Sequence, residues 1–171
     1  MACRTDTTLC VIVLVSITQL VLQGYAMNQC DFIKTTGTNT EYFGLWQTGT
    51  NLTSCHSYSS VDSITNGARS AFTLSMLAGF AAGVMVLFEF LLCNVPCAGV
   101  LEGAGYLCAW VLSGATFMLF GNTTCANAQF SCTLAPASGY VIASVLCYAA
   151  AGFLLCCTPQ PDPLCKQCCS K

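Results

Sequence analysis

The chain has 171 residues, of which 7% are charged and 55% hydrophobic, and its formal net charge is −2. Roughly 25% of residues are charged in an average soluble domain, so this composition excludes an ordinary soluble fold of this size. The weak negative charge gives no basis for binding nucleic acid or for docking on anionic lipid. We therefore expect a single domain, residues 1–171, whose apolar surface faces a lipid bilayer.

Long intervals without charge locate the expected membrane spans. Residues 7–30 and 70–88 carry no charge, and the uncharged interval 103–161 is 59 residues long. A span needs about 20 mostly apolar residues, and in lipid only a helix satisfies the backbone of such a run. The longest interval has room for two spans around a polar, turn-rich loop. We predict four helices, near residues 8–26, 70–92, 98–120 and 138–157.

The first predicted span has a second interpretation. An apolar run of 14 residues, 9–22, follows Arg4 and precedes the small residues Gly24 and Ala26. This pattern is also typical of a signal peptide that is cleaved after Ala26. Cleavage would leave three spans with the same loop topology. The retained helix is favoured, because the uncharged stretch is long enough to span a bilayer.

Two loops, residues 27–69 and 121–137, fall on one side of this four-span arrangement. Each contains a glycosylation sequon, at Asn51 in the first loop and at Asn122 in the second. Because such sequons are used in the lumen, they favour an outer position for both loops and cytoplasmic N and C termini. The Lys and Arg counts barely separate the two sides. We expect the plasma membrane, with an endomembrane or vesicle membrane as the alternative.

Small residues recur every four positions in the last three spans, which places them on one face of each helix. Such faces let helices approach closely in lipid and predict a tight bundle. The sets are Gly79 and Gly83, then Gly99 and Gly103, then Gly139, Ala143, Cys147 and Ala151.

The cysteines divide between the two sides of the membrane. An even number in the outer loops, an oxidising compartment, predicts two disulfides. Pairing within each loop, Cys30–Cys55 and Cys125–Cys132, is favoured, and a bond between the loops is the main alternative.

Five inner cysteines cluster at the end of the last span and in the tail, residues 158–171: Cys156, Cys157, Cys165, Cys168 and Cys169. Cysteines beside a membrane are common S-palmitoylation sites, and acyl chains there would hold the tail on the bilayer. Unmodified thiols are the alternative. The spacing of Cys165 and Cys168 suits zinc, but no second pair follows, so we expect no metal and no cofactor.

Glu89 and Glu102 are the only charged residues within the predicted spans. Membrane carboxylates are often functional, so the pair could handle ions in a small channel or transporter. The simpler interpretation is favoured: each lies about one turn from the inner end of its helix and reaches water.

The first loop carries the sequence Gly44-Leu45-Trp46, followed by Cys55, and Arg69 lies where the second span begins. With a long first loop, a tiny inner turn and a short second loop, the chain resembles the claudin and peripheral myelin protein superfamily. Amastin-like surface proteins of protists share this layout. Claudins have two cysteines after Gly-Leu-Trp in the first loop, whereas here only Cys55 follows in that loop, so we do not expect a typical tight-junction claudin.

The resemblance implies an all-α membrane domain, a left-handed bundle of four transmembrane helices. It also implies a small extracellular β-sheet, built mainly by the first loop, with Trp46 at the outer interface.

No catalytic set is recognisable, because the single histidine, His56, lies in an outer loop beside Cys55. We expect a non-enzymatic surface protein that acts through contacts, in adhesion, membrane organisation or as an accessory subunit. Its partners would be the bilayer and other membrane proteins in cis or trans, and a homo-oligomer remains open. The aromatic residues Tyr42, Phe43 and Trp46 would supply binding energy if they are exposed.

Overall fold

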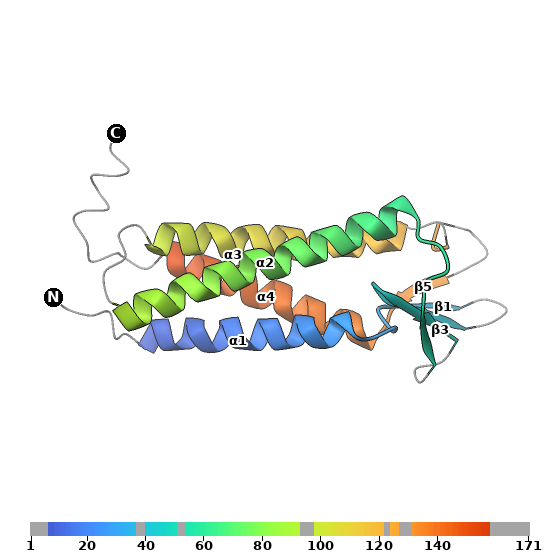
Figure 1. Ribbon diagram of the computed structural model, residues 1–171, viewed down its shortest axis with the longest axis horizontal. Helices are drawn as coiled ribbons and strands as arrows, with labels where there is room; N and C mark the ends of the chain where they lie inside the picture. Colours follow the sequence, from blue (N-terminus) through green and yellow to red (C-terminus); the bar gives the residue numbers. More distant parts are fainter. Residues whose placement is uncertain are drawn as a thin grey trace.

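The computed structural model describes residues 7–36, 40–50, 54–92, 98–121, 124–126 and 131–157. Four antiparallel helices lie side by side, and a small sheet covers one end of them (Figure 1). All four helices are long and apolar enough to cross a membrane. Their bounds are Thr7–Met27 (α1), Ser63–Leu92 (α2), Ala98–Ala115 (α3) and Pro136–Cys157 (α4).

The second helix begins seven residues before the predicted span, at Ser63 instead of residue 70. The backbone N–H of Thr65 donates a hydrogen bond to Oδ1 of Asp62 over 2.8 Å, which caps the helix. The charge-free interval starts only after Arg69, so charge alone missed the first two turns of α2. The third helix is followed by a 3₁₀ helix, Thr116–Gly121 (η1).

The helices form a ring in which each contacts two neighbours, in the order α1, α2, α3, α4. The buried residues of α1 are spaced alternately by four and three positions, a pattern typical of left-handed bundles. They are Ile12, Ser16, Gln19, Gln23 and Ala26.

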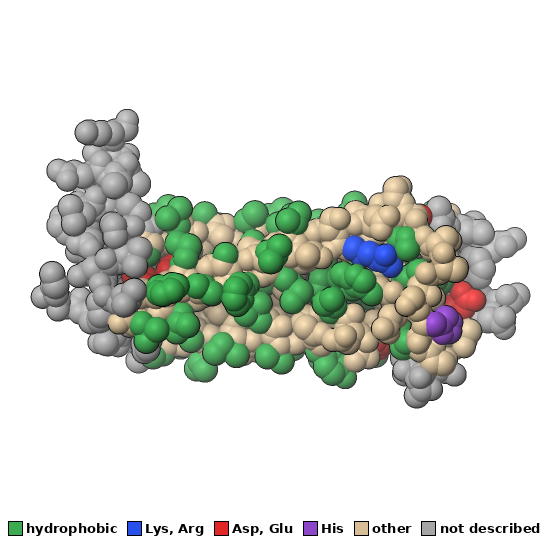
Figure 2. Space-filling model, in the orientation of Figure 1, with side chains coloured by type: hydrophobic (Ala, Val, Ile, Leu, Met, Phe, Trp, Pro, Cys, Tyr) green, Lys and Arg blue, Asp and Glu red, His purple; other side chains and the backbone are tan. Residues whose placement is uncertain are grey.

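On the face shown in Figure 2, hydrophobic side chains are spread along the whole length of the bundle. Leu14, Val21 and Leu146 are each 64–65% exposed, and every one of the four helices presents such side chains. Several core positions are polar instead, which is the reverse of the pattern in a water-soluble bundle.

Small residues do bring the helices together, although not on every expected face. A side chain at Gly79 would collide with the ring of Tyr148, and one at Gly105 would lie 3.0 Å from Cβ of Ala82. The expected ladder on α4 is right only in part: Ala151 is buried, but Gly139 has nothing within 4 Å of its Cβ position. The packed stripe on α4 runs instead through Val141, Ser144, Tyr148 and Ala151.

The sheet has five antiparallel strands in the order β4-β3-β2-β1-β5. The first loop supplies four of them, as expected: Ile33–Thr36 (β1), Glu41–Phe43 (β2), Gln47–Gly49 (β3) and Cys55–Ser57 (β4). The second loop supplies Ser131–Leu134 (β5), which pairs with β1. Both loops therefore build one sheet.

A separate hydrophobic cluster joins the sheet to the helices. Phe32, Ile33 and Leu45 from the sheet side are at most 1% exposed and pack with Ala68 and Phe72 of α2. The sheet is thus anchored through apolar contacts to the ends of the helices.

Candidate functional site

The Gly44-Leu45-Trp46 segment joins β2 to β3 and lies against α2. The N–H of Gly44 donates to the carbonyl of Gln47 over 2.8 Å. A side chain at Gly44 would collide with the carbonyl oxygen of Gln29 and lie 2.8 Å from Cα of Cys30. Only glycine therefore lets this turn approach the end of α1.

Trp46 packs on Phe72 of α2, with the ring centroids 5.5 Å apart in an edge-to-face arrangement. The indole is therefore part of the contact between the sheet and the bundle.

Arg69 connects this turn to α2. Its Nε donates to the carbonyl oxygen of Leu45 over 2.6 Å, and its guanidinium stands 5.1 Å from the ring centroid of Tyr58. Tyr58 in turn donates its hydroxyl to the carbonyl of Gly44 over 2.7 Å. The four motif residues of the sequence, Gly44, Leu45, Trp46 and Arg69, thus meet at one place, where they hold the sheet on the helices.

Burial raises the pKa of Tyr58 to about 12; the charge of Arg69 opposes this rise and that of Asp62 adds to it. The phenol therefore stays protonated, and remains a hydrogen-bond donor, over the physiological range.

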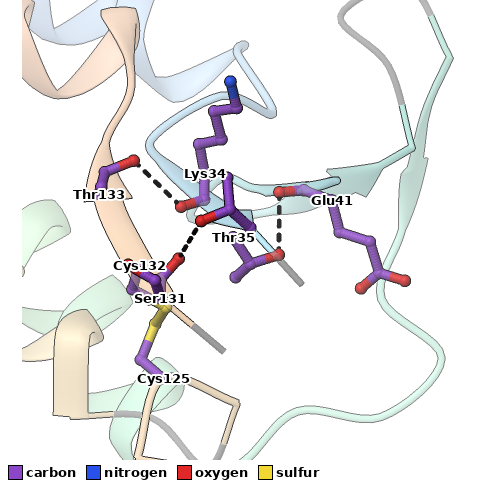
Figure 3. The surroundings of a disulfide bond; sticks show 8 residues. Lys34, Thr35, Glu41, Cys125, Ser131, Cys132 and Thr133 are labelled. Atoms are coloured by element: carbon purple, nitrogen blue, oxygen red, sulfur yellow. Dashed lines mark hydrogen bonds between the residues drawn. A yellow bond between two sulfur atoms is a disulfide. The ribbon is translucent and has the colours of Figure 1, made fainter. Parts of the chain in front are cut away.

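Two disulfides brace the outer part, and both follow the favoured pairing within each loop. Cys30–Cys55 ties the segment after α1 to β4. Cys125–Cys132 closes a short ring in the second loop, beside the strands (Figure 3). In the same view Thr35 of β1 donates to the carbonyl of Glu41, and Thr133 of β5 donates to that of Lys34. These bonds add to the strand pairing of β1 on both of its sides.

The aromatic residues that we expected to bind a partner are only partly available. Tyr42, Phe43 and Trp46 are all half-buried. Phe43 and Trp46 pack against the hydrophobic cluster under the sheet, so much of their surface serves the fold. The strand β4 is exposed at all three of its residues, Cys55, His56 and Ser57.

A depression in the outer part remains open to solvent, and we call it the outer hollow. Its larger part, of about 380 Å³, is lined by Glu41, Phe43, Thr48 and His56 among others. A smaller part of about 200 Å³ extends to Asp62, Thr65 and Thr124. Phe43 and Tyr58 line both parts, so the two adjoin there.

The inner carboxylates differ in their surroundings. Glu102 is fully buried, whereas Glu89 is half-buried. The favoured expectation that both side chains reach water is therefore wrong for Glu102, which points into the bundle. Among the described residues, no three His, Cys, Asp or Glu side chains come together in a way that could hold a metal ion.

A polar core in the helices was missed by the sequence analysis. The amide of Gln23 donates to the hydroxyls of Ser75 on α2 and Ser113 on α3, each over 3.1 Å. Its oxygen accepts from the hydroxyl of Tyr148 on α4 over 2.9 Å. One side chain of α1 is thus bonded to all three other helices.

Nearer the inner end, the hydroxyls of Ser16 on α1 and Tyr106 on α3 are in hydrogen-bond contact. Between these two groups lies Gln19, which is fully buried and has no hydrogen-bond partner among the described residues. The signal that could have revealed this core was the spacing of the polar residues of α1 at positions 16, 19 and 23, all on one helix face.

Several predicted sites lie outside the described residues: Asn51, Asn122, Cys165, Cys168 and Cys169. The side chain of Cys157 is also outside them, whereas Cys156 is described and exposed as a free thiol. No protein-family model matches the chain, and no curated protein matches it either.

Proposed function

We propose that the chain is a non-enzymatic, multi-pass surface protein that acts by binding other proteins through its outer sheet. The observation that carries the proposal is that the sheet end of the molecule is both firmly braced and exposed. The sheet is braced by two disulfides and a hydrophobic anchor, yet β4 and the outer hollow stay exposed. Such a rigid, exposed platform suits recognition.

Insertion of all four helices in a bilayer is part of the same proposal. It is supported by their length and by their exposed apolar side chains. Since α1 starts and α4 ends at the end of the bundle away from the sheet, one orientation puts both termini in the cytoplasm and the sheet outside (Figure 1). We propose the plasma membrane as the location, with glycans on Asn51 and Asn122 and acylation of the inner cysteines.

The proposed relationship is remote membership of the claudin and peripheral myelin protein superfamily, which includes a claudin-like sheet built by the first loop. It is supported by the meeting of Gly44, Leu45, Trp46 and Arg69 under the sheet.

Photo-crosslinking in intact cells tests the contact function. A photoreactive amino acid at His56 or Ser57, both exposed on β4, should yield discrete protein adducts. The same group at Leu14, which is 64% exposed on the apolar surface of α1, serves as the control and should react mainly with lipid. Absence of any protein adduct at both sheet positions would count against the proposal.

A small channel or transporter is the second candidate, favoured by the burial of Glu102 in an otherwise apolar span. Glu102 lies one turn before Tyr106, whose hydroxyl meets Ser16, so polar groups continue into the bundle. Purified protein in liposomes should then pass protons or cations, and Glu102→Gln should abolish the flux. Flux that persists in Glu102→Gln would remove this candidate.

A further inference from the structure

The outer hollow lies on a face of the sheet and not along an edge. Phe43 is paired with Thr48, and Thr48 with His56, so the three side chains form a row on one face across β2, β3 and β4. Glu41 lies two residues before Phe43 in β2 and shares that face. Tyr58 completes the hollow, with its ring centroid 6.5 Å from that of Phe43 and the two rings tilted by 30°.

The lining is rich in hydroxyl groups. Eight of the fourteen residues that line the two parts of the hollow carry a hydroxyl. A hydroxyl can both donate and accept hydrogen bonds, although those of Thr48 and Tyr58 already donate to the carbonyls of Tyr42 and Gly44. The hydroxyl groups of the lining belong to Thr48, Thr50, Ser57, Tyr58, Ser59, Ser60, Thr65 and Thr124.

Little charge is available in the hollow for a charged ligand. Asp62 already caps α2 through the N–H of Thr65, and the guanidinium of Arg69 stands over Tyr58 nearby. Because Asp62 and Arg69 are engaged in these contacts, Glu41 is the one exposed carboxylate of the lining. His56 lies on the same face of the sheet, in β4. A strongly cationic or anionic ligand therefore finds no matching cluster.

We propose that the outer hollow binds a neutral pyranose unit of a glycan. The part of the Phe43 ring that stays exposed would take the C–H face of the sugar ring, beside Tyr58, whose ring already has the Arg69 guanidinium over it. The Glu41 carboxylate and His56 would bond the hydroxyls of the sugar. The hydroxyl groups of the lining complete the match, because a sugar presents donors and acceptors in equal mixture. The inference rests on the proposed contact function and names the chemistry of the partner.

The position of the hollow favours a sugar over a peptide strand. An added strand would pair with the backbone at a sheet edge, as in β-augmentation, whereas the hollow opens between side chains on a face. Its volume of about 380 Å³ also lies at the small end of the range of ligand pockets, roughly 300–1,000 Å³.

Saturation-transfer NMR on the full chain in nanodiscs tests the proposal. The probes are the methyl glycosides of glucose, galactose, mannose and N-acetylglucosamine, with the anionic N-acetylneuraminic acid and a neutral Ser/Thr-rich peptide for comparison. We expect transfer to the ring protons of at least one neutral glycoside and not to the other two probes. Glu41→Ala and His56→Ala should each weaken binding about tenfold, the loss expected for one hydrogen bond.

Thr133→Ala is the matched control, because Thr133 is exposed on β5 at the opposite edge of the sheet. It should leave glycoside binding unchanged, and all variants should remain folded at the temperature of the binding measurement. Absence of transfer to every glycoside, transfer that survives both variants, or binding of the peptide alone would each overturn the proposal. The contact function itself would still stand if photo-crosslinking at β4 trapped a protein partner.

Discussion

Gly44 is a residue of the outer sheet with no room for a side chain. Its Cβ position is filled by backbone atoms of Gln29 and Cys30, which cannot move like the end of a flexible side chain. Gly44→Ala should therefore lower the free energy of unfolding by about 1–3 kcal/mol, the usual cost of overpacking. The control is Gly24→Ala, since Gly24 has open space at its Cβ position. Thermal unfolding in detergent measures both, and equal melting temperatures would contradict this account of the turn.

Tyr58 gives the outer sheet a dependence on alkaline pH. Its pKa rises from 10.0 to about 12 on folding, so the folded state holds the proton more tightly than the unfolded state. The stabilisation is complete below pH 10 and is lost as pH rises through about 12. Wild type should be more stable than Tyr58→Phe at pH 8, and the difference should shrink above pH 10. Denaturant unfolding at several pH values tests this, and a difference that grows with pH would refute it.

The helices are held by a polar contact that apolar packing cannot replace. Gln23 bonds to Ser75, Ser113 and Tyr148, one residue on each of the other helices. In membranes each interhelical hydrogen bond contributes about 0.6 kcal/mol on average, so Gln23→Leu should destabilise the bundle by about 1–2 kcal/mol. The control is Thr18→Val, because the exposed Thr18 bonds only to the carbonyl of Leu14 in its own helix. The free energy of unfolding of both variants can be measured in mixed micelles. If Gln23→Leu lowers it no more than Thr18→Val does, this role of Gln23 is contradicted.

The same contacts bear on whether α1 is retained or is cleaved off as a signal peptide. A cleaved signal peptide would end at Ala26 and would remove Ser16 and Gln23 together with their bonds to the other helices. We therefore propose that α1 remains in the mature protein. The length of its uncharged stretch also favours a retained helix.

Sequence and structure agree best where a single physical requirement decides the outcome. Charge-free length alone was enough to find four helices, because a long uncharged run has few alternatives to a helix in lipid. The pairing within each loop was favoured because it keeps each bond inside one loop, and the structure follows it at separations of 25 residues for Cys30–Cys55 and 7 for Cys125–Cys132. The strand β5 could not be foreseen, since its pairing with β1 spans about a hundred residues of chain and the loop is short and polar.

On the scale of the whole molecule, we propose that the sheet faces the outside of the cell while the ends of the chain lie inside. The chain offers a direct reporter, because it has only three lysines: Lys34 in β1, and Lys166 and Lys171 in the tail. A membrane-impermeant amine reagent applied to intact cells, followed by peptide mass spectrometry, should label Lys34 alone. The tail lysines should react only after the cells are permeabilised. Labelling of Lys166 and Lys171 in intact cells, with Lys34 protected, would contradict the account.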